Sequence, residues 1–257
     1  MTILYTELLQ WLIHLWYPFM RVTGFFMVSY FFSSGFIPTK VKLILSLCYT
    51  LFVSSIIEIQ PVDSVFTLHY IIYGINQFAF GLGLGFIVGL FFYLFSYAGQ
   101  IITLQMGLTM SIMNDPTNGF STVVLSYIKI LLAILFFLAL DGHIAVLIVL
   151  VDSFHIFGIN STFPFNNLEY VIHIMVWFFK SGLLIASPAI SVMLISQISF
   201  GFIAKISPSF NIFSLGFPMT MLFGVFAFWL SIRGLSDSFL NFLLDILDYS
   251  RQYVRIV

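Results

Sequence analysis

The sequence contains very few charged residues. Asp, Glu, Lys and Arg together make up 7% of the 257 residues, whereas a soluble domain carries about 25%. Apolar residues make up 61% of the chain, so a soluble surface would have to be built from residues such as Phe and Leu. Such a surface would expose apolar patches far beyond the roughly few hundred Å² that a soluble monomer tolerates. The shortage of polar residues therefore indicates a protein covered by lipid, by partner subunits or by both.

Other absences exclude several kinds of site. The net charge of −1 excludes a nucleic-acid binder held by a basic patch. The single cysteine, Cys48, lies in an apolar run and has no partner for an internal disulfide. Zinc, redox, phosphate-binding and hydrolase motifs are all missing. We therefore expect no metal, no cofactor and no catalytic residue, and the chain is not expected to be an enzyme.

Basic residues are also too few to orient the chain in a membrane. Lys40 and Lys42 form the basic loop pair, and Arg251 and Arg255 the basic tail, so the positive-inside rule gives no topology. Residues 1–11 contain no Lys or Arg, unlike the cationic start of a secretory signal peptide. We therefore expect the first helix to remain in the mature protein.

Long apolar runs separated by breakers predict an all-α, polytopic membrane protein with broken helices. Ser64 to Asn114 contains no charged residue, and its 51 residues far exceed the roughly 20 that span a bilayer. Because glycines interrupt this run, we expect it to split near Gly74–Gly81, with a second helix over Gly83–Leu104. The other expected helices cover Leu8–Phe32, Val41–Ile57, Ser121–Leu140, Gly142–Phe157, Glu169–Ile206 and Met219–Ile232, with breaks over Asn114–Gly119, Gly158–Leu168 and Ser207–Pro218.

The last segment, Leu235–Arg255, has a different pattern. Its polar residues recur at steps of three or four and share one helical face: Asp237, Asn241, Asp245, Asp248, Gln252 and Arg255. The opposite face is apolar and aromatic: Phe239, Phe242, Leu243, Ile246, Tyr249 and Tyr253. This pattern predicts an amphipathic helix that lies at an interface or packs on a partner, rather than crossing lipid alone.

Three basic residues stand inside or at the edge of apolar runs: Arg21, Lys129 and Lys180. A central Lys or Arg costs at least about 2.5–3.5 kcal/mol on membrane-insertion scales. Two interpretations stay open. The side chains either reach the membrane interface or form internal ion pairs, or they face protein within a large assembly. Together with Asp152 they also leave open a proton-coupled small-molecule transporter.

Glycines recur every four residues at Gly81, Gly85 and Gly89. On a helix they share one face and allow another backbone to approach closely. The spacing fits packing within the chain and contact with another subunit equally, and both interpretations make these residues structural.

Two histidines, His143 and His155, flank a predicted helix near Asp141 and Asp152. Twelve residues of helix separate the two rings by roughly 18 Å and place them on different faces. A shared metal site is therefore not expected.

A Met-rich segment ends the long uncharged run. It contains Met106, Met110 and Met113, carries no charge before Asp115, and stops at Pro116. Methionine fills irregular gaps and repacks easily, and irregular backbone at membrane depth must be buried in protein or line a cavity. The segment therefore either packs in a core or seals a channel, and its candidate residues are Gln105, Met106, Gly107, Leu108, Met110, Met113, Asp115 and Pro116.

An ordered set of motifs across nearly the whole chain resembles the FliR family. The central motif is the run Gly99–Leu108 followed by Asp115–Pro116. The further motifs are Pro38–Leu43, Asp141–His143, Val151–His155 and Ser207–Pro218. No single motif is specific to the family. The resemblance rests on finding all of them in the same order as in the family.

The resemblance implies a subunit of a bacterial type III protein-export gate in the inner membrane, within the flagellar basal body. Such a subunit joins FliP- and FliQ-type subunits, with FlhB- and FlhA-type export components as further partners, and passes unfolded export substrates through a pore surrounded by membrane lipid. Residues 1–168 would form a FliP-like portion, and residues 169–257 a FliQ-like hairpin whose turn lies at Ser207–Pro218.

The resemblance also assigns the Met-rich segment. The loop at residues 106–120 would plug the closed pore, and Arg21 and Lys180 would be buried against protein. The run Asp115–Gly119 is closer to the pattern of injectisome subunits, so a virulence export gate stays an alternative to the flagellar one.

Overall fold

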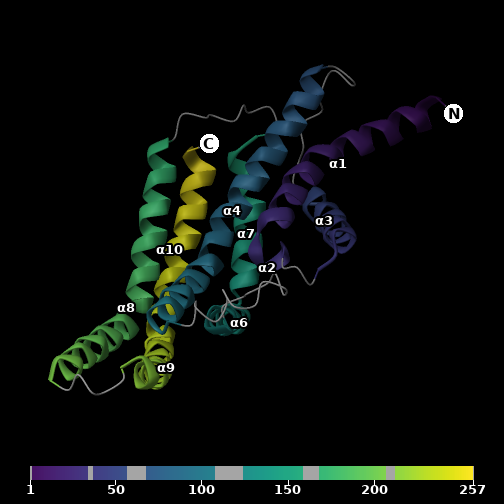
Figure 1. Cartoon of the computed structure of the whole chain (residues 1–257). Coiled ribbons are helices and arrows are strands. Elements are labelled where there is room, and N and C mark those ends of the chain that lie inside the picture. Colours follow the sequence, from purple (N-terminus) through teal and green to yellow (C-terminus); the bar gives the residue numbers. More distant parts are fainter. Residues whose placement is uncertain are drawn as a thin grey trace. The chain divides into compact units, whose positions relative to one another are not determined.

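The computed structural model describes residues 2–33, 37–56, 68–107, 124–158, 168–206 and 212–256, and these residues fold into helices with no strand among them (Figure 1). The prediction of an all-α chain is therefore confirmed over the described residues. In chain order the helices are α1 (Thr2–Val28), α2 (Tyr30–Ser33), α3 (Thr39–Ser54), α4 (Leu68–Gln105), α6 (Val124–Ala139), α7 (Gly142–Ile156), α8 (Leu168–Ile206), α9 (Ile212–Arg233) and α10 (Leu235–Ile256).

Two helices are long and apolar enough to cross a membrane by themselves, over Tyr70–Gln105 in α4 and Glu169–Ile203 in α8. Two further pairs, α6 with α7 and α9 with α10, qualify as candidate spans by length and composition only when the two members are taken together, and the helix bends by 72° and 62°, respectively, at the break between them. At the first break Asp141 has φ 54°, a left-handed conformation that interrupts a regular helix. The described residues thus contain two to four candidate spans, as predicted for a polytopic protein with broken helices.

The predicted split of the long uncharged run is wrong. Instead, α4 is one continuous helix of 38 residues from Leu68 to Gln105. The glycines do not break it because they allow other groups to approach. A Cβ at Gly74 would lie 2.9 Å from Trp16 Nε1, and a Cβ at Gly83 would overlap the Tyr253 hydroxyl.

The predicted loop over Ser207–Pro218 is too long. Helix α9 already begins at Ile212 and contains Pro218, while residues 207–211 lie outside the described residues. A proline removes one backbone hydrogen bond from a helix, and membrane-protein helices tolerate this loss more readily than soluble ones. Helix α9 therefore starts before Pro218, and not after it as predicted.

The chain divides into two compact units, each built from separated stretches. The first unit contains Met1–Phe91, Leu140–Ile174 and Leu244–Val257, and the second contains Phe92–Ala139 and Met175–Leu243. This division follows contacts in space. It does not address the boundary between a FliP-like and a FliQ-like portion near residue 168, which stays a prediction.

In the first unit, α3 turns its small polar residues inward. Its buried residues are Ser46, Thr50 and Val53, and Ser46 Oγ accepts a hydrogen bond from Thr23 Oγ of α1 at 3.2 Å. Ile44 is 61% exposed and Phe52 is 58% exposed. A helix that buries hydroxyls and exposes aliphatic and aromatic groups requires an apolar environment outside.

The amphipathic character predicted for the last segment is confirmed in α10. The described residues of the predicted polar face are exposed, namely Asn241, Asp245, Asp248, Gln252 and Arg255. On the predicted apolar face Phe239, Phe242, Leu243, Ile246 and Tyr253 are buried and Tyr249 is half-buried. The side chain of Asp237 lies outside the described residues.

Glycines bring α1 and α4 close together in the first unit. A Cβ at Gly24 would lie 2.5 Å from the Phe78 carbonyl oxygen, and one at Gly85 would lie 2.7 Å from the Phe25 carbonyl oxygen. A Cβ at Gly81 would overlap the carbonyl oxygen of Arg21. Backbone atoms cannot swing aside as a long side chain can, so this crossing requires glycine.

We predict that Gly81→Ala lowers the unfolding free energy of the chain by about 1–3 kcal/mol, because an added methyl group forces two tightly packed backbones apart. The matched control is Gly201→Ala in α8, where an added Cβ meets nothing within 4 Å. Alanine there should be neutral or stabilise the helix by up to about 1 kcal/mol. Thermal unfolding of both variants in detergent measures the difference, and equal midpoints would contradict the predicted close crossing.

Candidate functional site

Arg21 is fully buried in the first unit, at 0% exposed, and bonds to groups of α4 and the end of α7. Its Nε donates a hydrogen bond to Gln77 Oε1 at 2.7 Å, and its Nη2 donates to the same oxygen. Nη1 donates to the carbonyl oxygen and to Oγ of Ser153, at 2.7 and 3.1 Å. Nη2 also donates to the carbonyl oxygen of Phe157 at 2.7 Å. These five bonds match the five N–H donors of a guanidinium group.

Three of the four acceptor atoms belong to the C-terminal end of α7, and the fourth is Gln77 Oε1. Phe157 is the residue that caps this helix, and Ser153 lies in its last turn. The last carbonyl groups of a helix carry partial negative charge. The Ser153 carbonyl oxygen accepts the Phe157 N–H at 3.0 Å as well as the bond from Arg21. A cation placed against them is therefore favoured, and Arg21 caps α7 from a different helix.

Aromatic rings surround the remaining surface of the guanidinium group. Its central carbon lies 4.1 Å from the ring centre of Phe154, 4.8 Å from that of Phe80 and 5.4 Å from that of Phe157. Such cation–π contacts stabilise a desolvated arginine by about 2 kcal/mol or more. Among the described residues no carboxylate reaches Arg21, so its charge is balanced by carbonyl, amide and hydroxyl dipoles and by ring faces.

Gln77 links the cluster further, because its Nε2 donates to the carbonyl oxygen of Gly158 at 3.2 Å. This bond fixes which end of the amide faces Arg21. Sequence reasoning identified Arg21 but missed Gln77, although a buried amide in a run free of charged residues is itself a signal of a polar partner.

Lys129 of α6 is the second fully buried cation, at 0% exposed, and it lies in the second unit. Its Nζ donates to Ser231 Oγ at 2.6 Å, and Ser231 Oγ donates in turn to the carbonyl oxygen of Ile185 at 2.8 Å. The ring of Phe228 lies 5.9 Å away. An ammonium group has three donors, so within the described part of the chain Lys129 is less fully compensated than Arg21.

The other predicted structural residues lie in different surroundings. Lys180 is exposed on α8, so its burial against other protein stays a prediction about an assembly. Gly81 and Gly85 face α1, as described above, and Gly89 is buried.

The start of the Met-rich segment is described, and the rest is not. Met106 is 2% exposed and packs against Gly224 of α9, where an added Cβ would overlap its side chain. Gln197 Nε2 donates to the main-chain and side-chain oxygens of Gln105, both at 3.3 Å. Gly107 has φ 71°, a common conformation just after a helix end. Five predicted residues lie outside the described residues: Leu108, Met110, Met113, Asp115 and Pro116.

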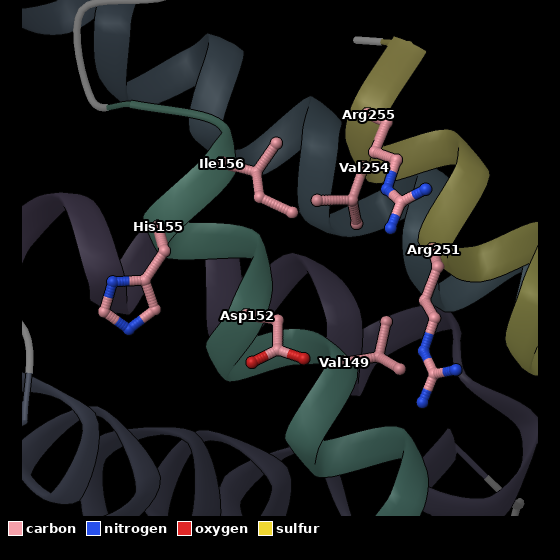
Figure 2. A pocket seen from close by; sticks show the side chains of 7 residues that line it. All are labelled: Val149, Asp152, His155, Ile156, Arg251, Val254 and Arg255. Atoms are coloured by element: carbon pink, nitrogen blue, oxygen red, sulfur yellow. The ribbon is translucent and has the colours of Figure 1, made fainter.

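The two histidines do not share a site. His143 is half-buried and His155 is exposed, on a pocket that also contains Asp152 (Figure 2). Within the described ranges no group of three His, Cys, Asp or Glu residues is placed to hold a metal ion.

We predict that Arg21→Lys lowers the unfolding free energy by about 2–4 kcal/mol. Lysine keeps the charge but lacks the planar fork, so several buried oxygens lose their donors. The same substitution at Arg233, which is exposed on α9 and lies over Trp229 at 4.8 Å, should change the stability by less than about 1 kcal/mol. Thermal unfolding in detergent compares the two variants. Equal effects would contradict the claim that the five hydrogen bonds of Arg21 stabilise the first unit.

Comparison with known proteins shows the family of the chain. The family model described as "Bacterial export proteins, family 1" matches residues 12–246. The flagellar biosynthetic protein FliR of Escherichia coli strain K12 is 31% identical over 219 residues, covering 84% of this chain and 83% of that protein. The FliR protein of Pectobacterium carotovorum is 29% identical over 226 residues, covering 85% and 84%. That of Aquifex aeolicus is 27% identical over 247 residues, covering 96% and 95%.

The resemblance to the FliR family that the ordered motifs predicted is thereby confirmed. Because the family model covers nearly the whole chain, this protein belongs to family 1 of the bacterial export proteins.

Proposed function

We propose that the chain is the FliR-type subunit of a flagellar protein-export gate. The observation that carries this proposal is the family match over residues 12–246, together with relatives named flagellar biosynthetic proteins that cover most of both chains. In this proposal the chain resides in the bacterial inner membrane, within the flagellar basal body, and its role is structural rather than enzymatic.

The outer faces of the helices support a role inside an assembly. On α8, large apolar residues stand exposed along the whole helix, among them Val176, Leu184, Ile195 and Phe202. Only 28% of its most apolar stretch of 18 residues is buried within the chain. Lipid or neighbouring subunits would cover these residues, and we assign the neighbours to FliP- and FliQ-type subunits, with FlhB- and FlhA-type components further out.

The Met-rich segment at residues 106–120 is proposed to plug the closed pore. Its first residues are anchored, because Met106 packs on Gly224 and Gln197 bonds to Gln105. An anchored start followed by glycine in a left-handed conformation suits a segment that leaves its helix and returns to a defined place. Flexible thioether side chains would exclude ions and still give way to an unfolded polypeptide.

The Arg21 cluster argues against a small-molecule transporter. A carrier residue must exchange partners during transport, whereas all five donors of Arg21 are engaged by groups of its own unit. We therefore assign Arg21 to the scaffold and not to a proton or substrate pathway.

The plug is tested by replacing residues 108–114 with a Gly-Ser sequence of equal length, which keeps the connection but removes the apolar side chains. We expect ion leak across the membrane to rise several-fold in cells producing the assembled gate, because the seal is lost while the pore remains. Leak is measured in the same cells as ion flux across the inner membrane, and flagellar export is scored in parallel.

The matched control replaces residues 159–165, the connection before α8, in the same way. Leak should rise only for the first variant. Equal leak from both variants, with the gate assembled, would remove the plug assignment and return the segment to core packing. Restored motility in a cell lacking its own FliR-type subunit supports the flagellar gate, and rescue confined to an injectisome would contradict it.

A further inference from the structure

An open pocket of about 340 Å³ lies between α7 and α10 in the first unit (Figure 2). It is lined by Val149, Asp152, His155, Ile156, Arg251, Val254 and Arg255. These residues come from the last two turns of α7 and from the end of α10. Neither Arg21 nor the described start of the Met-rich segment is among its lining residues, so the pocket is separate from the described features above.

The charged groups on this pocket are not satisfied by one another. Arg251 and Arg255 stand one turn apart on α10, and Figure 2 shows the Asp152 carboxylate on the facing helix α7, with the His155 ring directed away from α10. Among the described residues, Asp152, Arg251 and Arg255 make no ion pair within 4.0 Å and no hydrogen bond through their side chains. The pocket therefore presents two cations and one anion that are all available to a ligand.

Exposed apolar side chains continue from the pocket along α7. Ile144 is 48% exposed and Ile148 is 51% exposed on the turns of α7 that precede Asp152. On α10 Leu244 is 56% exposed, but the exposed residues between it and Arg251 include Asp245 and Asp248, so the apolar surface belongs to α7. A polar pocket at the end of an apolar surface matches a ligand with a charged head and a hydrocarbon tail.

We propose that this pocket binds the head group of a phosphatidylethanolamine lipid. The guanidinium groups of Arg251 and Arg255 would bind the phosphate, which arginine recognises with paired N–H donors. The Asp152 carboxylate would accept hydrogen bonds from the primary ammonium group. The acyl chains would lie along Ile144 and Ile148 of α7.

The charge arrangement distinguishes this lipid from others. Phosphatidylglycerol supplies the phosphate but no cation for Asp152. Phosphatidylcholine supplies a cation of the same charge whose methyl groups leave it without N–H donors. Of these three lipids, only phosphatidylethanolamine satisfies both arginines and the carboxylate.

The test measures binding of the three lipids, with identical acyl chains, to the full chain in detergent by native mass spectrometry. We expect an apparent Kd for phosphatidylethanolamine at least about threefold lower than for the other two. Arg251→Gln combined with Arg255→Gln should weaken its binding about tenfold, because both cations that bind the phosphate are lost. Asp152→Asn should abolish the preference over phosphatidylglycerol while binding of phosphatidylglycerol persists.

Matched controls are Lys205→Gln and Asp245→Asn, which remove exposed charges outside the pocket and should leave all three affinities unchanged. Circular dichroism verifies that every variant keeps its helices. Equal affinity for the three lipids, tighter binding of phosphatidylglycerol, or phosphatidylethanolamine binding that survives loss of both arginines would each overturn the proposal. The result does not depend on export activity, so it is independent of the proposed gate function.

Discussion

Arg21 places a full positive charge in the interior of the first unit, where it is 0% exposed. Burying an ion costs several kcal/mol unless its donors are matched, and here neutral groups match all five. Those groups come from α4 and the end of α7, so the helices must hold their positions for the charge to be tolerated. The glycine crossing of α1 on α4 then follows, because Gly81 packs on the backbone of Arg21 itself.

Polar side chains are used in the interior, and the outer surfaces of α3 and α8 are apolar. Helix α3 buries its small hydroxyl residues, with Ser46 bonded to Thr23 of α1, and exposes Ile44 and Phe52. Helix α8 exposes aliphatic and aromatic residues along its length. Neither surface is stable in water, which agrees with a membrane protein whose family serves protein export. Helix α10, in contrast, exposes a polar face that includes Asp245, Asp248, Arg251 and Arg255.

Features with a local cause could be predicted from the sequence. The period of α10 and the break at Asp141 depend on neighbouring residues, and both were predicted. The continuity of α4 was not predicted. A glycine weakens an isolated helix but also permits close packing, and which effect is larger depends on the element that packs against it. The bonds of Arg21 to Gln77 and Ser153 cross 56 and 132 residues, so no local pattern could reveal them. Lys180 is exposed in the chain itself, and whether another subunit buries it depends on the assembly.

The central claim is that the chain is a subunit of an export gate. Its most direct test is affinity purification of the tagged chain after co-expression with FliP- and FliQ-type subunits, followed by native mass spectrometry. The account predicts one stable complex that contains all three proteins, with little free chain, because the exposed apolar faces of α3 and α8 need protein or lipid cover. A chain recovered alone, monodisperse and surrounded only by detergent, would contradict an export-gate subunit and favour a protein complete in itself.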